Sequence, residues 1–268
     1  MTVDLGKRSV LGVEVNVIDY EAAVARILEA ASSGGALSVS ALAVHGVMTG
    51  ALDITHKYRL NRLDIVAPDG QPVRWALRLL HGERLLDRVY GPALTRRVCA
   101  AAARRGLPIY LFGSKLEVLE AWKSKLAIEL PDLVVAGYEP SRFRQMSDQE
   151  ASDLDARVVA SGARIVFVGL GCPRQEVFAY EHAKALSMPV IAVGAAFNFE
   201  AGTKEAPDWM QRAGLEWLFR LALEPRRLWR RYLLLNPLYC LLISAQKLGL
   251  LKAWFEREQA PSRPLRFG

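Results

Sequence analysis

Between about residues 9 and 200, short runs of β-branched and apolar residues alternate with longer segments in which apolar residues recur at helical spacing. The short runs that read as strands are 37–42, 63–67, 108–113, 133–137, 164–169 and 189–194. The helical segments between them include 21–32, 91–106 and 147–162, and the last begins with Ser147 and Glu150 at the spacing of a capping box. Strands that alternate with helices build a mostly parallel sheet. We therefore predict an α/β fold, with a Rossmann-like sheet that carries helices on both faces.

The composition narrows the class of protein further. The chain has 268 residues, of which 51% are hydrophobic, so it can bury a large core and is not disordered as a whole. Its cysteines, Cys99, Cys172 and Cys240, are too far apart for a disulfide framework or a paired-cysteine zinc motif, and its four histidines show no metal-ligand spacing. We expect no metal. The first ten residues contain Asp4 and no apolar run, so they do not resemble a secretory signal, and a reducing cytoplasm is the expected setting.

The character of the chain changes near residue 205. From there to the end, 11 Lys and Arg stand against 6 Asp and Glu, and leucines and aromatic residues interleave with arginines. We divide the chain into an α/β core over 1–204 and a basic, amphipathic helical appendage over 205–268. The apolar stretch 232–251 is about as long as a membrane span, but polar residues such as Asn236 interrupt it. We expect the appendage to lie on the core or in a membrane interface.

Arginines recur in this appendage one helical turn apart. Pro225 is expected to restart a helix, in which Arg226 and Arg230, and likewise Arg227 and Arg231, are four residues apart. Like charges at this spacing repel each other, so the cluster fits a region that binds an anion. Phosphate suits the guanidinium group, and a solvated basic face is the alternative. Nucleic acid is not expected, because the basic residues are not distributed over the core and no reader motif is present.

Ligands of an open parallel sheet bind outside the carboxyl ends of its strands, and this rule selects a few loops. Asp69 follows the second predicted strand after Pro68 and precedes a helix. A carboxylate in that loop can act as a general base, and a helix-capping aspartate is the alternative. Arg88 precedes another helix and can bind phosphate, with an exposed ion pair to Asp87 as the alternative.

The fifth predicted strand, 164–169, leads into the segment Gly-Leu-Gly-Cys-Pro-Arg-Gln-Glu. Gly171 permits a tight turn, and the helix that follows presents free N–H groups to an anion. Pro173 fits a first helical position, whereas Gln175 and Glu176 add nothing to a cap. The loop lacks the third glycine of a dinucleotide fingerprint and the lysine of a Walker loop.

Five blocks, in the order APDGQPVRWAL, DRVYGPALT, VFVGLGCPRQE, VGAAFNFEAG and GLEWLFRLALEPRRLWRRYL, are similar to those of the WecG/TagA/CpsF glycosyltransferases, also called glycosyltransferase family 26. The resemblance covers about residues 10–235. It implies transfer of a sugar from a UDP-sugar to a polyprenyl-diphosphate-linked acceptor at the cytoplasmic face of the membrane. It also implies inversion at the anomeric carbon, without a metal or another cofactor.

The resemblance further implies roles for individual residues. Asp69 matches the aspartate proposed as the family's general base, and Arg88 matches the arginine of its DRxxG block. The donor-pocket block GxGxPxQE falls on Gly171, Pro173, Gln175 and Glu176. The arginines of the family's appendage, which are thought to hold the diphosphate, fall on Arg220, Arg227 and Arg230.

The chain departs from the family at two places. Where relatives carry Thr-x-Asn after the first helix, this chain has Ser40 for the threonine and Leu42 for the asparagine. Leu42 cannot make the hydrogen bonds of an asparagine, so we expect His45 to substitute for it. Asn198, in the donor or substrate site, stands where many relatives have aspartate. The donor therefore stays open between UDP-glucose and UDP-N-acetylmannosamine or its uronic acid.

Together these features predict a hexosyltransferase of bacterial surface or exopolysaccharide biosynthesis that is cytoplasmic and peripherally associated with the inner face of the cell membrane. One alternative is an NAD(P)-binding oxidoreductase, which would need a GxGxxG motif after its first strand, and that motif is absent. The other is a non-catalytic membrane-surface adaptor, which would leave the loops of Asp69 and Gln175 without a role. The sequence leaves open whether the chain forms a homo-oligomer.

Overall fold

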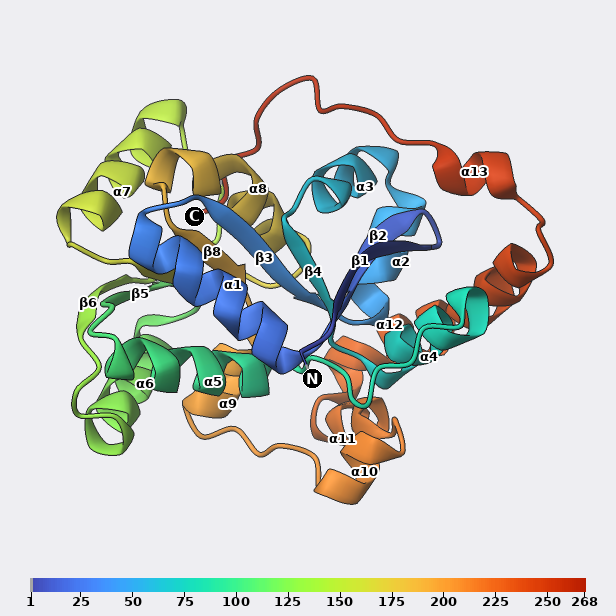
Figure 1. The fold of residues 1–268 in the computed structure, drawn as a ribbon, viewed down its shortest axis with the longest axis horizontal. Helices are drawn as coiled ribbons and strands as arrows, with labels where there is room; N and C mark the ends of the chain where they lie inside the picture. The colour runs from blue at the N-terminus through green and yellow to red at the C-terminus, as the bar shows by residue number, and fades with distance from the viewer. Residues whose placement is uncertain (1) are drawn as a thin grey trace.

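The structure, a computed structural model, describes residues 2–268 apart from the side chains of Arg227 and Arg231. Its centre is a six-stranded parallel sheet with the order β4-β3-β8-β7-β5-β6 (Figure 1). The strands are β3 (Leu37–Leu42), β4 (Ile65–Pro68), β5 (Ile109–Gly113), β6 (Val135–Glu139), β7 (Ile165–Gly169) and β8 (Pro189–Ala192). The predicted α/β fold is confirmed, and each predicted strand lies within about two residues of an observed one.

Helices cover both faces of the sheet, because alternate residues of each strand point to opposite sides. In β7, Ile165 and Phe167 pack into one apolar cluster, whereas Val166 and Val168 pack into the other. The helices on the first side are α1 (Tyr20–Ser33), α5 (Gly91–Arg104), α6 (Leu116–Glu129) and α9 (Gly194–Glu200). Those on the second side are α2 (Val44–Leu52), α3 (Ile54–Asn61), α4 (Gln71–His81), α7 (Asp148–Ala160) and α8 (Arg174–Leu186).

An antiparallel hairpin precedes the sheet, and the sequence did not predict it. It consists of β1 (Asp4–Val10) and β2 (Val13–Ile18), and β2 is buried along most of its length. Leu11 and Gly12 form its two-residue turn, both with positive φ angles, as the tight turn of a twisted hairpin requires. A β-carbon at Gly12 would also overlap the Phe255 carbonyl oxygen, so the turn sits directly against the C-terminal part of the chain.

The residues after 205 form α10 (Asp208–Arg212), α11 (Glu216–Leu223), α12 (Pro225–Lys247) and α13 (Lys252–Glu256). Pro225 occupies the first turn of α12, as expected. Tyr239, Ile243 and Phe255 belong to the same apolar cluster as the second face of the sheet, and the Lys57 ammonium donates to the Phe255 carbonyl oxygen at 3.0 Å. Within residues 2–268, no helix combines the length and the apolarity that crossing a bilayer requires.

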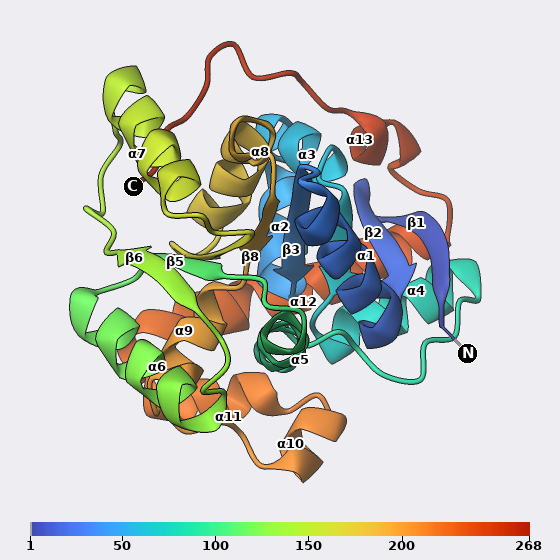
Figure 2. The same cartoon turned by 60° about the vertical axis from the view of Figure 1, so that its left-hand side comes forward.

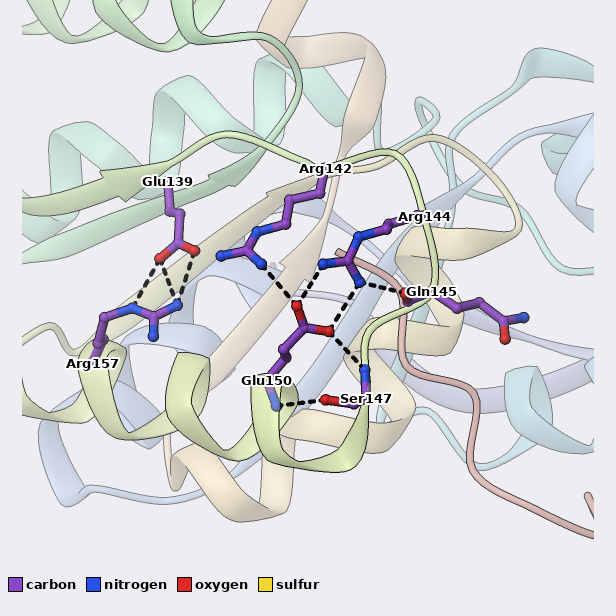
Figure 3. A network of polar contacts seen from close by, with 7 residues as sticks. All are labelled: Glu139, Arg142, Arg144, Gln145, Ser147, Glu150 and Arg157. Atoms are coloured by element: carbon purple, nitrogen blue, oxygen red, sulfur yellow. Dashed lines mark hydrogen bonds and ion pairs between the residues drawn. The ribbon is translucent and has the colours of Figure 1, made fainter.

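The last residues run back from α13 to the α7 side of the molecule (Figures 1 and 2), where Phe267 forms a β-bridge with Gln145. This is also where α7 starts. The predicted capping box is present: the Ser147 hydroxyl accepts from the Glu150 N–H, and the Glu150 carboxylate accepts from the Ser147 N–H (Figure 3). Arg142 and Arg144 also bind Glu150. Glu150 thus binds two arginines and the backbone of Ser147, and these contacts connect the loop between β6 and α7 to the start of α7.

Candidate active site

A cavity lies where the connections that follow two neighbouring strands, β3 and β8, leave the sheet toward opposite faces. The helix after β3, α2, packs on one face through Val47 and Met48, and the helix after the neighbouring β8, α9, packs on the other through Ala196 and Phe197. Such a divergence opens a crevice at the carboxyl ends of parallel strands. A cavity of about 370 Å³ lies there, with residues after β3, β4 and β8 on one side and residues of α11 and α12 on the other. These helices gather where β3 and β4 end (Figure 1).

Asp69 lies in this cavity, directly after β4. Its N–H donates to the Leu42 carbonyl oxygen at 3.3 Å, which fixes the residue beside the end of β3. Gly70 rather than Asp69 is the N-cap of α4, and no side chain caps that helix, so the capping alternative does not apply. The side chain of Asp69 is therefore available to a bound molecule.

The surroundings of Asp69 raise the pKa of its carboxyl group to about 7. Burial is the largest cause, and the negative charge of Glu216 acts in the same direction, whereas Arg88, Arg220 and the Gly91 N–H oppose the rise. A carboxylate with a pKa near neutrality accepts a proton far more readily than an ordinary aspartate does. Its position and its proton affinity both suit a general base.

Arg88 joins the core to the C-terminal helices. Arg88 is 6% exposed, and its guanidinium group lies 2.7 Å from a Glu216 carboxylate oxygen and donates to the Gln211 side-chain oxygen at 3.0 Å. The ring of Tyr90 lies under it, with 4.3 Å between the guanidinium carbon and the ring centroid. Asp87 accepts from the backbone N–H of Arg88 at 2.8 Å and from the Gln71 amide at 3.4 Å. The guanidinium group of Arg88 pairs with Glu216 instead, so the alternative of an exposed pair with Asp87 does not apply.

A second cavity, of about 330 Å³, shares Gln71, Arg88 and Tyr90 with the first. Arg96, Arg97 and Arg212 line its far part together with acidic residues. Because Arg88 lies between the two cavities, its positive charge faces two adjoining spaces. This arrangement can hold two molecules next to each other, with an anionic group at their junction.

The side chain of Gln175 connects the loop after β7 to the loop after β8 by hydrogen bonds. Its side-chain oxygen accepts from the N–H groups of Gly171, at 3.1 Å, and Gly194, at 2.9 Å, and its amide donates to Glu176 at 2.9 Å. The hydroxyl of Ser40, inside β3, donates to the same Glu176 oxygen at 3.2 Å. Burial raises the pKa of Glu176, and its hydrogen bonds oppose that rise. These hydrogen bonds connect β3 with the loops that follow β7 and β8, and their residues do not line the cavity.

The remaining core residues of the predicted site separate into two groups. His45, in the first turn of α2, lines the cavity, as does Ala195, which follows the anchored Gly194. Pro173 stands one position before α8 begins at Arg174, rather than at the first helical position. Asn198 is on the exposed side of α9 and does not line the cavity.

The predicted diphosphate arginines do not lie together. Arg220, on α11, lines the cavity and packs over the ring of Phe199, with 5.5 Å between the guanidinium carbon and the ring centroid. Arg230, on α12, is exposed and packs beside Trp229 at 5.2 Å. The side chain of Arg227 lies outside the described part of the chain. Of the described arginines in this set, Arg220 is the one that faces Asp69.

Several residues of the cavity were missed by the sequence analysis. Glu216 belongs to the block GLEWLFR, in which the sequence analysis assigned a role to Arg220 alone. In the structure, Glu216 forms an ion pair with Arg88 of the core. Tyr232, Asn236 and Tyr239 face the cavity at intervals of one helical turn, so the inner face of α12 could have been found from that spacing. Trp75 of α4, the tryptophan of the block APDGQPVRWAL, adds an aromatic wall, although the sequence analysis gave it no role.

Among the described residues, one group of three metal-ligating side chains lies close enough to share an ion: His56, Cys172 and Glu176. It is beside the loop after β7 and does not include Asp69. The cavity at Asp69 therefore offers arginines, a carboxylate and aromatic side chains, which suit a phosphorylated organic substrate.

Comparison with known proteins agrees with this chemistry. Residues 8–253 match the sequence profile of the Glycosyl transferase WecG/TagA/CpsF family. A Bacillus subtilis (strain 168) protein, named N-acetylglucosaminyldiphosphoundecaprenol N-acetyl-beta-D-mannosaminyltransferase, is 32% identical over 186 residues. That alignment covers 69% of this chain and 70% of the Bacillus protein.

Proposed function

Because the chain belongs to the WecG/TagA/CpsF family and is a glycosyltransferase, we propose that it moves a sugar from a UDP-sugar to a saccharide linked to polyprenyl diphosphate, with inversion. One observation carries this proposal: Asp69, with a pKa near 7, lies in a cavity that also contains Arg220 and Arg88. The name of the Bacillus relative, which specifies a sugar diphosphoundecaprenol acceptor, supports the same acceptor class. The family assignment favours neither the oxidoreductase nor the adaptor.

In the proposed reaction, Asp69 takes the proton from a hydroxyl of the acceptor sugar. The hydroxyl oxygen attacks the anomeric carbon of the donor from the side opposite UDP. The new glycosidic C–O bond forms as the bond between that carbon and the phosphate oxygen breaks, and UDP leaves with the electron pair. Attack from the opposite side inverts the configuration, and general-base assistance typically contributes about 10²–10⁴-fold to the rate.

The leaving diphosphate gains negative charge, which the site must stabilise. We propose that arginines supply the positive charge instead of a metal, because Arg220 faces Asp69 and Arg88 lies between the two cavities. The sequence also assigned Arg227 and Arg230 to the diphosphate. Arg230 is exposed on α12, so we propose that it meets the diphosphate of the lipid-linked acceptor at the membrane surface rather than inside the cavity, and the same role is proposed for Arg227. Gln175 and Glu176 would act on the donor indirectly, by holding the Gly171 and Gly194 backbone in place.

The C-terminal helices would bring the site to its lipid-linked acceptor. Trp229, Leu233 and Leu234 of α12 are each about half exposed, at 46%, 57% and 62%, and Arg226 and Arg230 are exposed beside them. Apolar side chains flanked by arginines fit an anionic membrane interface, to which each basic residue contributes about 1 kcal/mol. We therefore propose that the enzyme acts at the inner face of the cytoplasmic membrane, in surface or exopolysaccharide biosynthesis.

The test is a transfer assay with the full chain. UDP-glucose, UDP-N-acetylmannosamine and its uronic acid are each incubated with a short-chain polyprenyl diphosphate-N-acetylglucosamine, and products are identified by mass and by NMR of the new linkage. We expect one donor to give an inverted product, at a rate that added Mg²⁺ or Mn²⁺ does not raise. Retention of configuration, dependence on these ions, or lack of transfer from all three donors would overturn the proposal.

A further inference from the structure

Three side chains from separate segments meet beside the loop that follows β7. His56 comes from α3, Cys172 from the connection between β7 and α8, and Glu176 from the first turn of α8. One ligand atom of each lies within 4.8 Å of the others. His56 is 3% exposed and Glu176 is 1% exposed, whereas Cys172 is partly exposed, so the group opens to solvent on its sulfur side.

Two buried polar atoms of this group lack a hydrogen-bond partner among the described residues: Nε2 of His56 and Oε2 of Glu176. Leaving a buried polar atom unsatisfied typically costs about 1–3 kcal/mol, so such atoms are rare and need an explanation. The Cys172 thiol lies close enough to the carboxyl group of Glu176 to lower its pKa. A nitrogen, an oxygen and a sulfur that converge in this way are the donor set of a divalent cation.

The carboxyl group of Glu176 is already oriented as a metal ligand would be. Its Oε1 accepts from the Gln175 amide at 2.9 Å and from the Ser40 hydroxyl at 3.2 Å. These bonds fix the plane of the group and leave Oε2 for a further partner. Carboxylate ligands of metals are commonly held by such outer hydrogen bonds, which set their direction and strengthen binding.

We propose that His56, Cys172 and Glu176 form a zinc site, separate from the cavity at Asp69. Zinc binds sulfur, imidazole nitrogen and carboxylate oxygen together, at about 2.0–2.3 Å. Tetrahedral geometry with these bond lengths puts the ligand atoms about 3.3–3.8 Å apart. Because these atoms lie within 4.8 Å of one another here, the side chains would move together by roughly 1 Å when the ion binds. The thiol releases its proton to solvent on binding, and the thiolate and carboxylate balance the charge of Zn²⁺. A water molecule on the open side completes the coordination.

Bound zinc would clamp α3 to the start of α8. Through Glu176 and Gln175 it would also steady the Gly171 and Gly194 backbone beside the cavity. The role of the zinc is therefore structural. Whether the chain binds zinc here does not depend on whether the proposed transfer reaction is correct. The sequence analysis expected no metal because it considered spacing along the chain, whereas these ligands come from three segments that only the fold brings together.

The test is metal binding by the full chain after treatment with a chelator. Zn²⁺ is titrated in competition with a chromophoric chelator, and Co²⁺ is used as a spectroscopic probe. We expect one equivalent of Zn²⁺ to bind, and a sulfur-to-cobalt charge-transfer band to appear. Cys172→Ser should abolish the band, and Cys172→Ser and His56→Gln should each weaken Zn²⁺ binding at least about tenfold.

Cys240→Ser and His81→Gln are the matched controls, because they remove a cysteine and a histidine outside the group. Both should bind Zn²⁺ as the unaltered chain does, and circular dichroism should confirm that every variant is folded. Equal Zn²⁺ affinity in the Cys172 and Cys240 variants would overturn the proposal. So would a cobalt spectrum without the charge-transfer band, or an unaltered chain that binds less than one equivalent.

Discussion

At the scale of single residues, the environment rather than the residue type gives Asp69 its chemistry. Burial and the carboxylate of Glu216 raise its pKa to about 7, although Arg88 and Arg220 act against the rise. The position of Asp69 after a strand was predictable from sequence, because strand and loop are adjacent in the chain. Glu216 was not, because only the folded chain brings α11 against the end of β4.

The pH dependence of the reaction follows from this environment. A carboxyl group whose pKa is raised to about 7 loses its base form as the pH falls through 7, so kcat/KM should decline below that value. Glu216→Gln removes a negative charge that raises the pKa of Asp69 and frees Arg88 to lower it. The acid limb of the pH–rate profile should therefore move to lower pH.

The matched control for this profile is Glu129→Gln, which removes an exposed carboxylate on α6. Its acid limb should coincide with that of the unaltered enzyme. An acid limb that stays in place in Glu216→Gln, or moves to higher pH, would show that Glu216 does not act on the catalytic proton.

At the scale of elements, the sequence predicted what periodicity and capping determine. The six strands and the start of α7 at Ser147 are confirmed, since each depends on neighbouring residues. The hairpin of β1 and β2 was missed, because its turn at Leu11 and Gly12 carries no Asn-Gly or Asp-Gly signal. The contacts of α11 and α12 with the core could not be predicted either, since they join segments far apart in the chain.

The ion pair between Arg88 and Glu216 should couple α11 to the core. Both side chains are largely buried, so Arg88→Met leaves the Glu216 carboxylate without its cation and should lower the free energy of unfolding by about 3 kcal/mol. The double variant Arg88→Met/Glu216→Met removes both charges and should be more stable than Arg88→Met alone. Urea unfolding measures both values, and strictly additive losses would contradict the coupling.

The packing of α12 provides a second test at this scale. Ile243 is 6% exposed and belongs to the apolar cluster on the second face of the sheet, so Ile243→Ala should reduce the free energy of unfolding by about 2–5 kcal/mol. Leu241, on the same helix, is 69% exposed, and Leu241→Ala should change the free energy of unfolding by no more than about 0.5 kcal/mol. Similar losses in the two variants would mean that α12 does not pack on the core as described.

At the scale of the whole molecule, the exposed face of α12 should direct the enzyme to its lipid acceptor. The double variant Leu233→Ser/Leu234→Ser removes two exposed leucines and should reduce binding to vesicles of phosphatidylcholine and phosphatidylglycerol by about tenfold or more. Ile128→Ser is the control, because Ile128 is equally apolar and 83% exposed on α6. Vesicle sedimentation measures the effect, and equal losses in both variants would remove α12 from membrane binding.

The claim on which the account depends is that Asp69 accepts the acceptor's proton, and turnover by Asp69→Asn tests it most directly. The substitution keeps the shape of the side chain. It should not destabilise the fold above pH 7, because a buried carboxyl group whose pKa is raised contributes less stability as the pH rises. With saturating UDP-sugar and lipid acceptor, we expect kcat to fall by about 10² or more while the Kd for UDP changes by less than about twofold. A kcat within a few-fold of that of the unaltered enzyme would contradict the account.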